Sequence, residues 1–168
     1  MADFNIDEVR GVFATDDIIP IGEDSNFGRF LKATAERLAN TKFFRRVYWA
    51  SAPGGTGLEF PYAAVLPTDL PETERMNVSN WKTYTVVVML CLLDDNVYRG
   101  TLRAMAMREK CEHVCRSKAR IQLEDGDIHE NTLLETTPWI VPEAEGGNFV
   151  FSTGFRIKYE CTEPRKEE

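Results

Sequence analysis

Residues 81–93 read Trp-Lys-Thr-Tyr-Thr-Val-Val-Val-Met-Leu-Cys-Leu-Leu, and this stretch decides the fold. Consecutive side chains of a β-strand point to opposite faces of the sheet. From Val86 onward, both of the resulting faces are apolar. Strands of this kind are typical of sheet centres that are covered on both sides. We therefore predict a central strand over residues 81–93, with helices or a second layer on both sides of its second half.

The residues that follow this strand predict a helix. Asp94-Asp95-Asn96 stops the strand and supplies an N-cap, so we expect a helix from near Val97 to about Arg120. One side of this helix is apolar or small and carries Ala104, Met107, Cys111, Val114 and Cys115. The arginines lie mostly away from that side and give the helix a basic outer face; they are Arg99, Arg103, Arg108, Arg116 and Arg120.

On the N-terminal side of the strand, the pattern predicts a first helix and two short strands. Asp24 and Ser25 are competent N-caps of a helix that ends near Asn40. Its apolar residues recur at helical spacing, at Phe27, Phe30, Leu31, Ala35 and Leu38. Short strands are expected at 46–49 and 62–66, followed by an excursion without periodicity over 67–80.

The C-terminal part ends in a strand of strict alternation. Aromatic or other inward-facing residues alternate with polar or small ones from Phe149 to Cys161, which predicts a half-buried strand. The preceding segment, 122–148, is expected to be a long irregular connection. Within it, Leu133-Leu134 and Trp139-Ile140-Val141 are interpreted as short strands or buried anchors.

These elements together predict an α+β fold with a single, mainly antiparallel sheet and two main helices packed on one face. Residues 1–25 are expected to form an acidic N-terminal arm, 26–161 a single domain, and 162–168 a charged C-terminal tail. A chain of 168 residues with 43% hydrophobic residues is long enough to bury its own core.

Composition disfavours several classes of protein. The net charge of −7 argues against a general nucleic-acid binder, because phosphate contacts are made by clustered lysines and arginines. The N-terminus has neither the basic start nor the apolar stretch of a signal peptide. The longest apolar run, 86–93, is far shorter than the roughly 20 residues of a membrane span. Four cysteines inside apolar segments favour a reduced, cytoplasmic chain.

The charges are distributed unevenly along the chain. Residues 97–120 carry seven basic and two acidic groups, whereas 122–148 carry seven acidic groups and no basic ones. The basic and the acidic segment can neutralise each other within one chain, or they can form complementary patches that bind identical neighbours. The simpler explanation is that both charged segments are ordinary solvent-exposed surface. The arm carries one basic and seven acidic groups around scattered apolar residues, which suits either docking into a partner or a frayed terminus; the docking candidates are Phe4, Ile6, Val9 and Phe13.

No motif predicts catalysis, a metal or a cofactor. Cys111 and Cys115 lie one helical turn apart in the apolar stripe, which favours buried structural cysteines over zinc ligands. His113 projects to another side of the helix, and only His129 is left as a third ligand. Residues 124–127 lack the spacing of a calcium loop and are interpreted as a turn. The prediction is therefore a structural protein rather than an enzyme.

The order of the elements and three short sequence segments resemble those of a known family. The three segments are Phe60-Pro61-Tyr62-Ala63-Ala64-Val65, Thr83-Tyr84-Thr85-Val86-Val87-Val88 and Phe155-Arg156-Ile157-Lys158-Tyr159. Over residues 26–161 the chain resembles the tail terminator proteins of long-tailed bacteriophages, the gpU-like family. The acidic arm and the extended 122–148 segment depart from the smaller members of that family.

The resemblance implies a virion protein, assembled in the host cytoplasm, that forms a ring, commonly a hexamer. Such a ring caps the head-proximal end of the tail tube, stops tube polymerisation and joins the tail to the neck or connector, and to a sheath where the tail is contractile. DNA passes through the lumen without specific binding. As a hypothesis, the five arginines named above engage acidic residues of a neighbour, for which the candidates are Glu124, Asp125, Asp127 and Glu130.

Three alternatives stay open. The first is another head-to-tail joining protein, such as a connector or head completion component. The second is a small α+β ligand-binding protein or enzyme with a pocket between the long helix and the 81–93 strand. The third is a weak RNA or DNA binder that acts through the basic helix.

Overall fold

The computed structural model describes residues 25–54, 57–68, 72–75, 79–116, 121–122 and 128–164. Two helices and seven strands are found in these ranges. In chain order they are α2 (Asn26–Asn40), β1 (Arg46–Trp49), β2 (Tyr62–Pro67), β3 (Glu72–Arg75), β4 (Ser79–Asp94), α3 (Val97–Cys115), β5 (Ile121–Gln122), β6 (Ile128–Glu145) and β7 (Asn148–Pro164).

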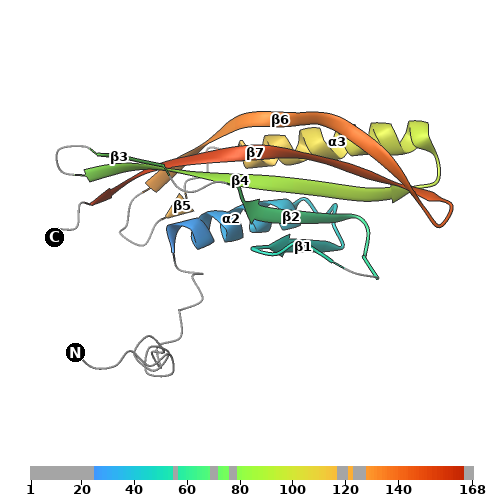
Figure 1. Cartoon of the computed structure of the whole chain (residues 1–168), viewed down its shortest axis with the longest axis horizontal. Coiled ribbons are helices and arrows are strands. Elements are labelled where there is room, and N and C mark those ends of the chain that lie inside the picture. The colour runs from blue at the N-terminus through green and yellow to red at the C-terminus, as the bar shows by residue number, and fades with distance from the viewer. Residues whose placement is uncertain are drawn as a thin grey trace, which may run out of the picture.

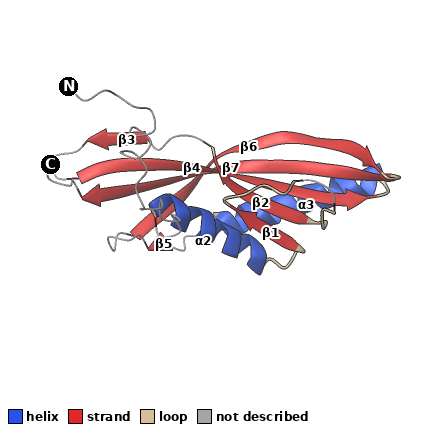
Figure 2. Cartoon of the chain, turned by 60° about the horizontal axis from the view of Figure 1, so that its bottom comes forward, coloured by secondary structure: helices blue, strands red, loops and turns tan. Residues whose placement is uncertain are grey.

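The strands form one sheet in the order β1-β2-β4-β7-β6-β5. Strands β2 and β3 pair with the same edge of β4, one after the other. Strand β2 pairs with residues 86–91 and β3 with residues 80–83. Every pairing is antiparallel except that of β1 with β2. Both helices lie on the same face of the sheet (Figures 1 and 2). The predicted α+β class, with a mainly antiparallel sheet, is confirmed.

Helix α2 follows the predicted pattern closely. The Ser25 hydroxyl accepts a hydrogen bond from the Gly28 backbone N–H at 3.1 Å and caps the first turn. On the inward side, the Phe30 ring stacks on the Tyr159 ring with centroids 4.5 Å apart. The Thr34 hydroxyl bonds the Tyr159 hydroxyl and the Phe30 carbonyl oxygen, so both buried hydroxyl groups are hydrogen-bonded. The side chains of Phe30 and Tyr159 are fully buried.

Helix α3 is pressed closely onto β7. The Asn96 side chain accepts a hydrogen bond from the Arg99 backbone N–H at 2.9 Å and caps the helix as predicted. Gly100 permits the close approach, because a Cβ atom at this position would lie 2.2 Å from the Phe151 ring. The helix ends at Cys115 and not at Arg120 as expected, with Arg116 as its C-cap residue. Residues 117–120 lie outside the described ranges.

The two faces of β4 differ in burial. The face towards the helices is fully covered, with Val86, Val88 and Leu90 at 0% exposure. On the opposite face, Val87 and Leu93 are partly exposed and Met89 is 39% exposed. The prediction of layers on both sides was therefore wrong: in the described part of the chain, both helices pack on the same side.

The segment 122–148 was wrongly predicted to be irregular. Strand β6 runs for 18 residues along β7. Its register shifts between Leu133 and Glu135 and again between Thr137 and Val141, which breaks the period of two on which strand prediction relies. Part of the predicted excursion 67–80 is also a strand, because β3 pairs with β4.

The predicted boundary at residue 161 falls too early. Strand β7 continues to Pro164, and Glu163 joins β7 to β4. The Glu163 carboxylate accepts a hydrogen bond from the Tyr84 hydroxyl at 2.7 Å and forms an ion pair with Lys82 at 3.1 Å. Partial burial raises the pKa of Glu163, but hydrogen bonds from Tyr84, Asn26 and Lys82 outweigh it and leave the pKa below its usual value. The first residues of the predicted tail therefore belong to the domain.

Candidate interaction surface along helix α3

Helix α3 carries apolar residues on its solvent side as well as on its buried side. Tyr98 is 77% exposed, and Leu102, Met105 and Val97 are each close to half exposed. Residues 98, 102 and 105 recur at the spacing of one helical face. We call Val97, Tyr98, Leu102 and Met105 the α3 stripe. The sequence pattern did not predict this stripe, because Arg99 and Arg103 stand between its apolar residues.

Two of the predicted interface arginines converge on a buried carboxylate of their own chain. The Arg99 guanidinium lies 2.8 Å from one Asp94 oxygen, and the Arg103 guanidinium lies 3.0 Å from the other. Arg99 also pairs with Asp95. The Asp94 side chain is only 1% exposed. Hydrogen bonds from Arg99, then from the Asn96 backbone N–H, hold the pKa of Asp94 well below its usual value.

The arginines further along the helix meet Glu112. Arg108 lies 2.8 Å and Arg116 4.0 Å from the Glu112 carboxylate. The Arg108 side chain is only 14% exposed and donates a hydrogen bond to the Thr153 hydroxyl of β7 at 3.4 Å. Arg108 therefore packs against the sheet, and its predicted place on the outer face was wrong. The three arginines of α3 and the C-cap residue Arg116 all have acidic partners within the chain.

The remaining predicted interface residues are not placed. Arg120 and the acidic candidates Glu124, Asp125 and Asp127 lie outside the described ranges, as do the arm residues Phe4, Ile6, Val9 and Phe13. Glu130 lies on β6 in register with Glu160 of β7. The expected contacts of these residues with a neighbour stay predictions.

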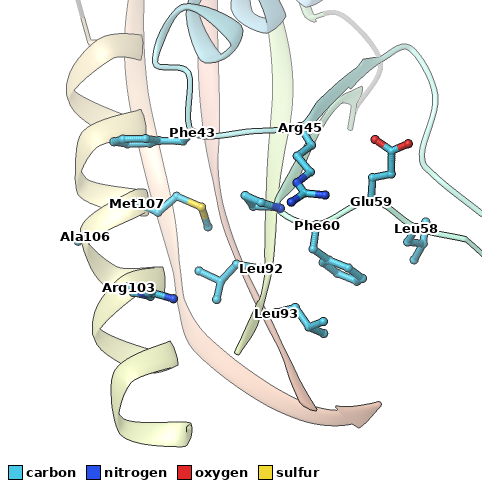
Figure 3. Close-up of a pocket in the computed structure, with 11 residues that line it drawn as sticks. Phe43, Arg45, Leu58, Glu59, Phe60, Leu92, Leu93, Arg103, Ala106 and Met107 are labelled. Atoms are coloured by element: carbon cyan, nitrogen blue, oxygen red, sulfur yellow. The ribbon is translucent and has the colours of Figure 1, made fainter. Parts of the chain in front are cut away.

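A cavity of about 800 Å³ opens between α3, the end of β4 and the segments that flank β1 and β2 (Figure 3). Its apolar lining comes from four parts of the chain: Phe43, Leu58, Phe60, Pro61, Leu92, Leu93, Ala106 and Met107. The charged lining residues are Arg45, Glu59 and Arg103. Of these, Glu59 forms an ion pair with Arg46 at 3.3 Å. The cavity lies between the long helix and the 81–93 strand, where a pocket was expected if the protein binds a small ligand.

A second hollow of about 560 Å³ continues along the helix towards its start. It is lined by Asn96, Tyr98, Arg99, Leu102, Arg103 and Ala106, and it shares Arg103 and Ala106 with the larger cavity. We call the two hollows together the α3 groove. The α3 stripe forms part of its wall through Tyr98 and Leu102.

The cysteines of α3 lie in the core, as their position on the predicted apolar side of the helix indicated. Cys111 and Cys115 are buried, and burial raises the pKa of each thiol to about 12. His113 is exposed on the same helix. Within the described ranges, histidine, cysteine and acidic side chains form no group of three that is close enough to hold a metal ion.

No protein-family model and no curated protein matches this sequence. Neither described helix is both long enough and apolar enough to span a membrane.

Proposed function

We propose that the protein is a structural subunit that associates with copies of itself into a ring, and that this ring is a phage tail terminator. The single observation that carries the self-association is the α3 stripe. A contiguous group of large exposed apolar side chains on a folded domain is typical of a protein–protein contact surface. The terminator role rests on the resemblance of residues 26–161 to the gpU-like family.

The arrangement of apolar surfaces supports a ring over a two-fold dimer. Rings form when a surface of one subunit contacts a different surface of the next. The described chain carries two unlike apolar surfaces on opposite sides of its sheet. One is the α3 stripe on the side of the helices, and the other is the open face of β4 around Val87 and Met89.

In this proposal the subunit works by shape and performs no bond-making step. The ring covers the end of the tail tube and presents no equivalent surface above it, so that tube subunits stop adding. The upper surface then receives the neck or connector, and DNA passes through the lumen. An acidic protein suits that passage, because negative charge repels phosphates instead of binding them.

The oligomeric state of the full chain tests the proposal. Native mass spectrometry and negative-stain imaging should show a ring for the wild-type protein. Leu102→Asp should release monomers with an unchanged circular dichroism spectrum, because a charge in an apolar contact must be desolvated. Lys110→Ser is the matched control: it lies on the exposed side of the same helix outside the stripe, and it changes the net charge by the same amount.

Two results would contradict the proposal. One is a wild-type protein that stays monomeric at high concentration. The other is a Leu102→Asp ring as stable as that of Lys110→Ser. The terminator role has its own test, since adding the ring to growing tail tubes should stop their elongation; tubes that lengthen at an unchanged rate would rule that role out.

A small-molecule-binding protein is the second candidate, and the 800 Å³ cavity favours it. Apolar walls with Arg45 and Arg103 among the lining residues suit an apolar carboxylate. A monomeric protein whose thermal midpoint rises with naphthoate would support this class. The change should disappear in Met107→Glu, which places a negative charge in the cavity wall.

A further inference from the structure

The α3 groove has the shape and chemistry of a site for an extended peptide segment. Its two hollows adjoin along the helix, with Arg103 and Ala106 common to both. Apolar side chains form most of the lining, from Phe43 and Phe60 at one end to Leu102 and Tyr98 at the other. An elongated apolar groove suits the alternate side chains of a docked chain better than a compact ligand.

The charges at the groove select the kind of segment. Three arginines line it: Arg45, Arg99 and Arg103. Arg99 and Arg103 share Asp94, whereas Arg45 forms no ion pair with any residue in the described ranges. The acidic lining residue Glu59 is already paired with Arg46. A segment that combines apolar side chains with carboxylates therefore fits the groove.

The chain itself contains such a segment. Residues 1–24 hold seven acidic groups and one basic group around apolar residues that include Phe4, Ile6, Val9 and Phe13. Opposite charge and apolar content thus both match the groove. An extended segment of this length reaches up to about 80 Å, far more than the groove requires.

The position of the groove relative to α2 favours a neighbouring copy as the donor. The arm joins the domain at Ser25, at the start of α2, whereas Phe43 and Arg45 follow the opposite end of that helix. Helix α2 has 15 residues, about 22 Å, so the arm is long enough to double back to its own groove, and it is the placement of arm and groove at opposite ends, not reach, that favours the neighbour. Figure 1 shows the start of α2 and the start of α3 well apart along the long axis of the molecule. A donor at one end and a receptor at the other is the head-to-tail arrangement that produces rings.

We propose that the acidic arm of one subunit, residues 1–24, lies in the α3 groove of the neighbouring subunit. This inference rests on the proposed self-association, because it needs a second copy of the chain. The arm covers Tyr98 and Leu102 from the side and pairs its carboxylates with Arg45. It thereby ties each subunit to the next in one direction around the ring.

Photo-cross-linking in the full chain tests this contact. Benzoylphenylalanine replaces Phe13, and equal amounts of nitrogen-15-labelled and unlabelled protein are mixed and refolded together before illumination. Mass spectrometry should find peptides from the arm joined to residues 43–45 or 98–107. Mixed isotope pairs identify a cross-link between two chains.

A substitution in the receiving groove sharpens the test. Ala106→Glu places a negative charge at the junction of the two hollows and should reduce the inter-chain cross-link by about tenfold or more. Lys110→Ser changes the net charge equally outside the groove and should leave the cross-link unchanged.

The possible failures can be told apart. Cross-links confined to a single chain, or rings in which the arm never reaches the groove, would overturn this inference and leave the proposed ring intact. A chain that stays monomeric under native mass spectrometry would overturn both. Equal cross-linking in Ala106→Glu and wild type would show that the arm binds elsewhere.

Discussion

Helices α2 and α3 cover the same face of the sheet, yet they present different surfaces to solvent. The exposed positions of α2 are Lys32, Glu36, Ala39 and Asn40, which are polar or small. Helix α3 exposes the large apolar side chains of the α3 stripe among its charged residues. The buried sides of both helices are comparable, since each packs a continuous row of side chains onto the sheet.

This difference separates two roles that a helix can have. The apolar residues of α2 are almost all used in the core, so the helix has completed its packing within one chain. Helix α3 has a second apolar side that the described part of the chain leaves exposed. A helix with two apolar sides is expected where one packs inside the domain and the other contacts a partner. The predictions below test the two helices separately.

The largest effect should come from Phe30→Ala on the inward side of α2. Removing a fully buried ring that stacks on Tyr159 is expected to cost about 3–5 kcal/mol of unfolding free energy. Urea unfolding followed by circular dichroism measures this loss. Phe43→Ala, at a position 43% exposed, should cost much less. Equal losses in the two variants would show that α2 does not hold the core in this way.

A smaller loss is expected from Gly100→Ala on the inward side of α3. The added Cβ atom meets the buried Phe151 ring, and overpacking of this kind costs about 1–3 kcal/mol. Alanine has a higher helix propensity than glycine, which adds about 1 kcal/mol to the unfolding free energy. We therefore expect a net loss of about 1 kcal/mol. Gly54→Ala is the control, because nothing lies within 4 Å of its Cβ position. A stabilised Gly100→Ala protein would contradict the close packing of α3 on β7.

The smallest effect concerns the polar start of α3 and depends on pH. Because the folded state lowers the pKa of Asp94, the ionised carboxylate stabilises the fold above the ordinary aspartate pKa of about 4. This contribution is lost as the pH falls towards the lower folded-state pKa. Asp94→Asn should therefore lower the thermal midpoint at pH 7 and differ less from wild type at pH 2.5.

The exposed neighbour of this residue supplies the comparison. Asp95→Asn removes a carboxylate that is 68% exposed and should lower the midpoint at pH 7 less than Asp94→Asn does. A gap between Asp94→Asn and wild type that is the same at both pH values would mean that the carboxylate charge contributes nothing.

The sequence predicted those elements in which one face is buried and the period is unbroken. Helix α2 and the caps at Ser25 and Asn96 were placed correctly, and strand β7 was predicted except for its last three residues. In each case the local residue pattern and the final packing agree, as when Phe151 and Phe155 alternate with exposed Arg156.

Strands β3, β5 and β6 were not predicted, and for β3 and β6 the physical reasons differ. Strand β6 contains register shifts and two prolines, Pro138 and Pro142, which hide its pairing with β7. Strand β3 has the sequence Glu-Thr-Glu-Arg and no apolar signal; it pairs along an edge of β4 that β2 leaves uncovered. Neither strand can be predicted from a short stretch of sequence, because each depends on its pairing with another strand.

The candidate site was predictable only in part. The row of α3 arginines was visible, but their pairing with Asp94 and Glu112 depends on the turn before the helix and on helical geometry. The groove brings Phe43, Phe60 and Leu92 together from segments far apart in the sequence. The side of α3 with Ala104, Met107 and Cys111 faces the core as predicted, but the sequence analysis did not identify the second, exposed apolar side.

Strand β6 has a consequence for how copies of this chain can meet. Its border away from β7 pairs with β5 only at residues 128–129, so a long row of backbone groups borders no other strand in the described ranges. Prolines and kinks along such a border hinder the addition of a foreign strand. This border therefore disfavours open-ended addition of strands from other copies, and if the proposed ring forms, its contacts must be made by side chains instead of by sheet extension.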